Sequence, residues 1–323
     1  MEINEKVIKI WSTIGPRAAF GMAALDFAKE YENLIILTCD VSTSAGLDRY
    51  RKTYPLKYLD LGIAEQNMMG VAAGLASENY NVVTTTFAPF QTMRCCEQVK
   101  VNFGYMKNKV CMVGIASGLV LGTLGYTHCC IEDLGVLRSI PGITILSPAD
   151  SLETIKCIKA GIENKNPTYV RLTGAANNPI VYAKDYDFEI GKSIKLKDGK
   201  DITIFCTGSM VSESLKSASI LEKFNINPSV INIHTIKPID KSAVNQACKN
   251  SKIIVSVEEH NIIGGLGSAI AEVKSQIENS PKHLILGIKD LYGKGGSYNF
   301  LKKKHRLTAE LIAEDIKNIY DRK

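Results

Sequence analysis

Residues 60–76 read DLGIAEQNMMGVAAGLA, a stretch in which the acid Glu65 begins a run of small and apolar residues. Four small residues recur there at helical spacing, namely Gly70, Ala73, Gly74 and Ser77. We therefore expect a helix with one face nearly bare of side chains, which another helix can approach closely. A carboxyl group at the mouth of such a helix is costly unless it is protonated or paired. Glu65 is a candidate for chemistry, and the alternative is a solvated acid favoured by the helix dipole.

Short apolar runs alternate with helical patterns on both sides of this stretch. Strands are expected at 34–38, 57–60, 81–87, 110–115, 143–146, 168–172, 202–206, 228–232, 253–257 and 283–287. Helices are expected at 6–30, from Glu65 onward, and at 91–102, 131–139, 151–163, 209–224, 240–248, 266–278 and 308–320. Such alternation is typical of parallel sheets with helices on both faces. We predict an α/β protein with two doubly wound domains, since 323 residues exceed one typical domain and the pattern breaks from 174 to about 191.

Composition and motifs exclude several classes of function. The chain is 45% hydrophobic and 22% charged with a net charge of +6, and it has no dense basic face for nucleic acid. It has no apolar run long enough for a membrane span and no signal peptide, and its nine cysteines lack zinc spacing. We therefore expect reduced thiols in the cytoplasm. Hydrolase, zinc-enzyme and nucleotide-hydrolase motifs are also missing from the sequence.

Two further features lie where strands are expected to end. Phe87 and Phe90 close the 81–87 strand, at the edge where open α/β sheets bind ligands, and aromatic rings there can stack on a flat heterocycle. His128 follows the glycine-rich segment 118–127, and an imidazole on such a loop is suited to moving protons. The alternatives are core packing for the two aromatic rings and a structural hydrogen bond for the histidine.

Taken in order, these stretches resemble the C-terminal half of transketolase-like thiamine diphosphate enzymes. The matching segments are DLGIAEQNM (60–68), TTFAPF (85–90), YTH (126–128), LRSIPG (137–142), SPAD (147–150), TIKPID (235–240), VEEH (257–260) and GGLG (264–267). The resemblance covers nearly the whole chain. It implies a pyrimidine-binding domain over 1–175, a linker over 176–190 and a transketolase C-terminal domain over 191–323.

The resemblance also implies roles for the candidate residues. Glu65 would hold N1′ of the aminopyrimidine ring of thiamine diphosphate and so activate the cofactor. A carboxyl group in a dry pocket can stay protonated for this task. Phe87 and Phe90 would pack on the ring. His128 would contact the hydroxyl groups of the donor sugar and help to move protons, so that both Glu65 and His128 are catalytic.

One motif of the family is missing from this chain. The family holds the diphosphate and a divalent metal such as Mg²⁺ through a Gly-Asp-Gly motif in a separate domain, and here Asp198-Gly199 lacks the first glycine. We therefore expect no metal site in this chain. A second polypeptide, the N-terminal transketolase subunit, would supply this half of the site in an α2β2 complex.

The substrate-binding positions match the family only in part. Arg17 and Ser44 match two phosphate contacts. Three other positions differ, because the expected histidine aligns with Ala116, the expected acid with Leu124, and the expected phosphate-binding arginine with Gly174. Arg171 is the candidate to replace that arginine. Losing a guanidinium costs a charge-assisted hydrogen bond worth about 1.5–3 kcal/mol, so we expect a changed substrate.

The resulting hypothesis is a transferase that moves a two-carbon ketol unit from a ketose to an aldehyde, active only with its partner. Its sugar would be modified, unphosphorylated or larger than the usual pentose phosphate. Two alternatives remain open from the sequence. One is half of a pyruvate-using enzyme, similar to deoxyxylulose-phosphate synthase or a 2-oxo acid decarboxylase. The other is a non-catalytic regulatory subunit.

Overall fold

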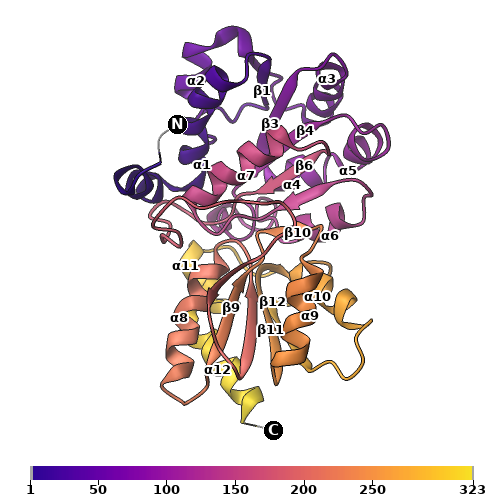
Figure 1. Ribbon diagram of the computed structural model, residues 1–323. Helices are drawn as coiled ribbons and strands as arrows, with labels where there is room; N and C mark the ends of the chain where they lie inside the picture. The colour runs from indigo at the N-terminus through magenta and orange to yellow at the C-terminus, as the bar shows by residue number, and fades with distance from the viewer. Residues whose placement is uncertain (1–2, 322–323) are drawn as a thin grey trace.

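The first sheet combines strands from the first half of the chain with one strand from the second half. In the computed structural model, which describes residues 3–321, it has seven strands in the order β10-β5-β6-β4-β3-β1-β2. Figure 1 shows β10, from the second half of the chain, at the boundary between the two units. The strands are β1 (Leu34–Thr38), β2 (Tyr58–Asp60), β3 (Asn81–Phe87), β4 (Val110–Ile115), β5 (Thr144–Leu146), β6 (Thr168–Arg171) and β10 (Thr235–Lys237). The pairs are parallel except that β10 runs antiparallel to β5. Parallel neighbours require crossover connections, which helices supply here.

Helices cover both faces of the first sheet. They are α1 (Glu5–Glu30), α2 (Asp48–Thr53), α3 (Glu65–Ser77), α4 (Ala88–Thr92), α5 (Cys96–Gln98), α6 (Asp133–Arg138) and α7 (Ser151–Glu163), with the short turns η1 (Pro55–Lys57), η2 (Val99–Tyr105) and η3 (Gly122–Leu124). Along β4, Val113 packs in the cluster that contains α1 and α7, whereas the preceding Met112 packs in the cluster that contains α3 and α6. Successive side chains of a strand point to opposite faces, so the sheet is buried on both.

The second sheet has five strands in the order β12-β11-β8-β9-β7. They are β7 (Ile194–Lys197), β8 (Ile202–Cys206), β9 (Pro228–Asn232), β11 (Ile253–Asn261) and β12 (Lys282–Ile288). Only β7 runs antiparallel to its neighbour. Helices α8 (Met210–Glu222) and α12 (Ala309–Tyr320) lie on one face and α9 (Lys241–Asn250) and α10 (Leu266–Lys274) on the other, while α11 (Tyr298–Lys304) lies next to the first unit (Figure 1). The predicted fold, two doubly wound α/β units, is confirmed.

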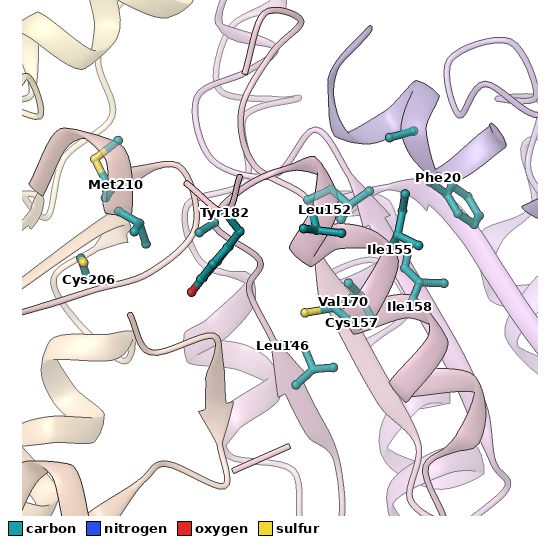
Figure 2. Close-up of a cluster of buried hydrophobic side chains, with 14 of the residues drawn as sticks. Phe20, Leu146, Leu152, Ile155, Cys157, Ile158, Val170, Tyr182, Cys206 and Met210 are labelled. Carbon is teal, nitrogen blue, oxygen red and sulfur yellow. The ribbon is translucent and has the colours of Figure 1, made fainter. Parts of the chain in front are cut away.

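The two units share buried apolar surface. Figure 2 shows Tyr182, from the connecting segment, between Leu152 of α7 and Met210 of α8. Asp150 fixes this segment, because its carboxylate accepts hydrogen bonds from the backbone N–H groups of Val181 and Tyr182, both at 2.9 Å. Residues 172–193 contain no helix or strand. The linker predicted at 176–190 falls within this segment, and its limits stay a prediction.

Several local expectations were wrong. The helix expected over 91–102 is broken into α4, α5 and the π-helical η2, and the structure adds β7, β10 and α11. The strand β10 is only three residues long, so its sequence has no clear strand pattern. Within residues 3–321, no helix has both the length and the apolar character that a membrane crossing requires.

Candidate active site

Most of the predicted site residues follow the carboxyl ends of parallel strands in the first sheet, whereas Arg17 lies on α1 and Arg171 within β6. Ser44 follows β1, Glu65 follows β2, and Phe87 and Phe90 lie at the end of β3. The loop with His128 follows β4. Because these strands are parallel, their carboxyl ends meet at one edge of the sheet, which is where open α/β sheets bind ligands.

Glu65 is buried and paired. It is the first residue of α3, it is 3% exposed, and its Oε2 accepts a hydrogen bond from Nη1 of Arg94 at 2.7 Å. A buried carboxylate requires such a partner, since an unpaired one is costly in a low-dielectric environment. Glu65 is therefore not a solvated acid of the first helical turn.

Arg94 is a site residue that the sequence analysis missed. Its guanidinium lies over the ring of Phe90, 4.1 Å from the ring centroid, while it pairs with Glu65. Its position one helical turn beyond Phe90 is the only signal in the sequence, and the break after α4 hides that signal. The carboxylate of Glu65 and the face of Phe90 therefore share one flat, cationic occupant.

Phe87, Phe90 and His128 form an aromatic cluster next to this pair. The imidazole of His128 lies 5.4 Å from the ring of Phe90 and 6.4 Å from that of Phe87, with edge-to-face geometry in both contacts. Such arrangements are favourable for aromatic rings. Nδ1 of His128 also lies 3.0 Å from the Thr127 hydroxyl. The structure thus brings together Glu65, Arg94 and the three rings.

Arg17 lies beside the kink in α1, and the turn that contains Ser44 packs on the same helix. The helix is interrupted at Gly15, whose φ is +81°, and Arg17 follows this kink. The turn with Ser44 packs on α1, because a Cβ at Gly46 would lie 2.9 Å from Cα of Ala18. Burial lowers the pKa of the Arg17 guanidinium, and no carboxylate within residues 3–321 forms an ion pair with it. A half-buried cation in such surroundings is suited to an anionic ligand.

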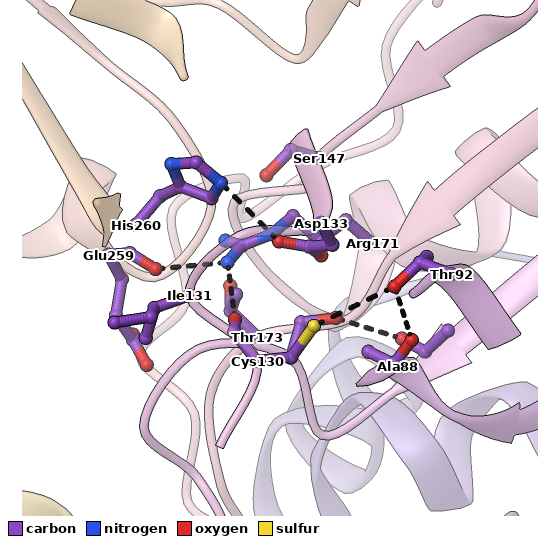
Figure 3. A network of polar contacts seen from close by, with 12 residues as sticks. Ala88, Thr92, Cys130, Ile131, Asp133, Ser147, Arg171, Thr173, Glu259 and His260 are labelled. Carbon is purple, nitrogen blue, oxygen red and sulfur yellow. Dashed lines mark hydrogen bonds and ion pairs between the residues drawn. The ribbon is translucent and has the colours of Figure 1, made fainter. Parts of the chain in front are cut away.

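Arg171 does not fulfil the expectation that it binds substrate. Its side chain is 1% exposed, and its Nε donates to both carboxylate oxygens of Asp133, at 3.0 and 2.8 Å (Figure 3). Its Nη2 donates to the backbone oxygens of Cys130 and Glu259. The guanidinium is therefore used inside the protein and is not available to a phosphate.

The other departures lie close to the His128 loop. Ala116, just after β4, is 1% exposed with a φ of +55°, a conformation that costs a non-glycine residue about 1–3 kcal/mol. Leu124 in η3 is 55% exposed. Strained backbone of this kind clusters at functional sites.

Asp198-Gly199 forms a structural turn between β7 and β8. A Cβ at Gly199 would lie 2.1 Å from the carbonyl carbon of Pro228, so backbone packs directly on backbone here. Across the part of the chain that the structure describes, no group of three or more His, Cys, Asp and Glu side chains is placed to hold a metal ion.

Comparison with known proteins matches both units. Residues 12–177 match the family model described as the transketolase pyrimidine-binding domain, and residues 191–312 match that of the transketolase C-terminal domain. A transketolase C-terminal section from Methanocaldococcus jannaschii is 36% identical over 304 residues, with 94% of this chain and 95% of that protein covered. A solved structure described as a split gene transketolase, inactive beta4 tetramer, is 33% identical with a TM-score of 0.85, and the match covers 94% of this chain and 97% of that one.

Two further relatives carry substrate names. The 6-deoxy-6-sulfo-D-fructose transketolase subunit SqwH of Clostridium sp. (strain MSTE9) is 35% identical over 300 residues, which cover 93% of this chain and 92% of that protein. An apulose-4-phosphate transketolase subunit of Phocaeicola vulgatus is 35% identical over 277 residues, which cover 86% of this chain and 88% of that protein.

Proposed function

This chain belongs to the transketolase family, and we propose that it is the pyrimidine-binding, C-terminal subunit of a two-component transketolase. The observation that carries the proposal is the cluster of Glu65, Phe87, Phe90 and His128 at one edge of the first sheet. The complete enzyme would move a two-carbon ketol unit from a ketose to an aldehyde. Thiamine diphosphate would supply the nucleophilic carbon that accepts this unit.

The residues present fit the pyrimidine half of that cofactor. Arg94 demonstrates that the space between Glu65 and Phe90 accepts a flat group that donates a hydrogen bond to the carboxylate and stacks on the ring. An aminopyrimidine ring is also flat, and its N1′ would donate to the carboxylate in the same way once it carries a proton. Glu65 would hold a proton at N1′, and Phe90, with Phe87 beside it, would exclude water from the ring face.

His128 and Arg17 have separate tasks in this proposal. The imidazole of His128, beside both phenylalanine rings, would hold the donor sugar and move the proton of its hydroxyl group. Arg17, together with Ser44 on the turn that packs on α1, would bind an anionic group on the sugar. With Arg171 sequestered by Asp133, Arg17 lacks the second guanidinium that the resemblance led us to expect.

This set of residues favours a modified sugar as substrate. Ala116 and Leu124 replace polar groups with apolar ones, so a hydroxyl group at those places would lose a partner. Relatives named for sulfofructose and apulose 4-phosphate support a sugar other than the usual pentose phosphates. Both names imply an anionic sugar, which would suit Arg17.

We further propose that a partner chain completes the site. It would be the N-terminal transketolase subunit with the Gly-Asp-Gly motif, and it would hold the diphosphate and a divalent metal such as Mg²⁺ in an α2β2 assembly. The solved split-gene relative is described as inactive when four β chains assemble. We propose that this chain is likewise inactive alone, and the cytoplasmic location remains a prediction.

The test is reconstitution with the partner chain, followed by a donor and acceptor panel. Ketol transfer by the complex and none by the lone chain is the expected result, with best efficiency on a sugar other than xylulose 5-phosphate and ribose 5-phosphate. Glu65→Gln should abolish transfer while the chain still assembles. Use of pyruvate instead of a ketose would favour the alternative of a pyruvate enzyme. Full activity of the Glu65→Gln complex would favour a regulatory subunit.

A further inference from the structure

The loop that carries His128 is held at its base and at its tip by residues of the second α/β unit, in addition to contacts within the first. It leaves the first sheet after β4, and its two ends pair with each other through Gly118 and Cys130, whose N–H···O distances are 2.8 and 2.9 Å. Between these ends the chain contains the short η3 turn and Gly125, whose φ is +77°. A loop built in this way has little structure of its own, so contacts from outside decide where His128 lies.

The base of the loop is fixed by Glu259, at the end of β11. This side chain is 1% exposed, and its Oε1 accepts a hydrogen bond from the backbone N–H of Leu119 at 2.7 Å. Its Oε2 accepts hydrogen bonds from the hydroxyls of Ser209 and Tyr298. Arg171 connects the backbone oxygens of Glu259 and Cys130, as Figure 3 shows. The Glu259 side chain lies so close to Gly118 that a Cβ there would be 2.3 Å from its Oε1, so only glycine fits at this position.

The tip of the loop is held by residues 292–305, which follow β12. The backbone N–H of Gly296 donates to the oxygen of Gly122 at 2.9 Å, and a Cβ at Gly122 would lie 2.2 Å from the side chain of Leu301. The Tyr126 hydroxyl lies 2.7 Å from Nε2 of His305, and the ring of Tyr126 also packs edge-to-face on that of Tyr292. Tyr126 is two residues before His128. This contact also gives a role to His305 within the basic segment 302–306.

We propose that the second unit contributes to catalysis indirectly. Its residues Glu259 and His305 are positioning residues for His128. The proposal rests on the proposed function, because it assumes that His128 handles the donor sugar. His305 holds Tyr126, and the turn that contains Tyr126 fixes the backbone of His128 through the hydrogen bond from its N–H to the oxygen of Gly125 at 3.1 Å. A displacement of about 1 Å in a group that orients substrate can cost about 100-fold in rate.

The test uses the reconstituted wild-type complex and three variants of the tip. Tyr126→Phe removes one hydroxyl and keeps the ring, His305→Leu removes its partner, and His305→Gln retains a hydrogen-bonding group. We expect Tyr126→Phe and His305→Leu to lower kcat about tenfold or more, with cofactor affinity unchanged and with partial recovery in His305→Gln. Tyr31→Phe is the matched control, because Tyr31 lies just before β1, at the amino ends of the strands, and its hydroxyl donates to Glu163 at the end of α7.

Hydrogen exchange on the same proteins provides a readout besides activity. Amides of residues 119–128 should exchange faster in Tyr126→Phe and His305→Leu and at the wild-type rate in Tyr31→Phe. If the wild-type complex is active and Tyr126→Phe has the same kcat, the positioning role is overturned even if hydrogen exchange becomes faster. The proposed function would then still stand. A wild-type complex that transfers no ketol unit from any donor would overturn the proposed function and, with it, the catalytic part of this inference.

Discussion

The buried carboxyl group of Glu153 makes the free energy of unfolding depend on pH. Comparison of wild type with Glu153→Gln separates this contribution from those of other groups. This carboxyl group is fully buried on α7 and accepts hydrogen bonds from the N–H of Ala149, from Nδ2 of Asn232 and from the hydroxyl of Tyr186. Burial, with the nearby charge of Asp150, raises its pKa from 4.5 to about 7. The folded chain therefore binds a proton between about pH 4.5 and 7 that the unfolded chain has released.

The sign and size of the effect follow from this difference. Because the folded state binds the extra proton, the contribution of Glu153 to the free energy of unfolding falls as pH rises through the window and is constant above pH 7. Each unit of pKa shift corresponds to about 1.4 kcal/mol, which gives about 3 kcal/mol in total. His234, His260 and His283, whose pKa values burial lowers to about 4, act in the opposite direction. The total pH dependence therefore hides the Glu153 contribution, and a difference measurement is needed.

The measurement is denaturant unfolding of wild type and Glu153→Gln between pH 4.5 and 8. We expect the variant to gain about 3 kcal/mol relative to wild type across this range, whatever its stability at the starting pH. Tyr186→Phe is the companion variant. The Tyr186 hydroxyl lowers the pKa of Glu153, so its removal should move the upper limit of the pH window to a higher pH. A stability difference between wild type and Glu153→Gln that stays constant with pH would refute the reasoning.

Three further predictions concern the site and its support. Arg94→Gln leaves the buried Glu65 unpaired and should lower the free energy of unfolding by about 1–2 kcal/mol, less than for a fully buried pair because the Arg94 side chain is 43% exposed. Arg17→Leu in the complex should raise KM for an anionic sugar about 10–100-fold, because one charge-assisted hydrogen bond is lost, while cofactor affinity stays unchanged. Gly21→Ala would place a Cβ 2.0 Å from the carbonyl oxygen of Gly46 and should destabilise the chain by about 3 kcal/mol in thermal unfolding.

Matched controls accompany the last two substitutions. Arg49→Leu removes an exposed cation of α2 and should leave KM for the sugar unchanged, so an equal rise in KM for both variants would contradict a specific role for Arg17. Gly70 is also a helical glycine, but a Cβ there would meet nothing within 4 Å. Gly70→Ala should therefore stabilise the lone chain by about 0.5–1 kcal/mol. Equal effects at both glycines would contradict the packing argument for Gly21.

The sequence predicted most strands of both sheets, because parallel strands buried on both faces are continuous apolar runs. It also placed Phe87, Phe90 and His128 where strands were expected to end, and the structure brings the three rings together because the carboxyl ends of parallel strands share an edge. It did not predict β10, whose three residues join the other sheet, or the break after α4, where tertiary packing overrides helical periodicity.

Arg171 shows that a basic residue close to a family's phosphate-binding position in the sequence need not bind a phosphate. Tyr169 and Arg171 are two residues apart in β6, so both side chains point to the same face, and both bond to the buried Asp133. Because side chains alternate along the strand, Arg171 points to the buried face with Asp133, where it cannot bind a phosphate. Arg94 was missed for a different reason, because its pairing with Glu65 depends on how the chain turns between α4 and α5.

The strand β10 has a practical consequence for engineering. Residues 235–237 belong to the second half of the gene and yet complete the edge of the first sheet, with Thr235 opposite Leu146 and Lys237 opposite Ile145. A chimera that joins the first half of this chain to the second half of a relative at the connecting segment would import a foreign edge strand. A chimera made to change substrate preference should therefore take β5 and β10 from the same parent, so that the paired strands keep their own side-chain contacts.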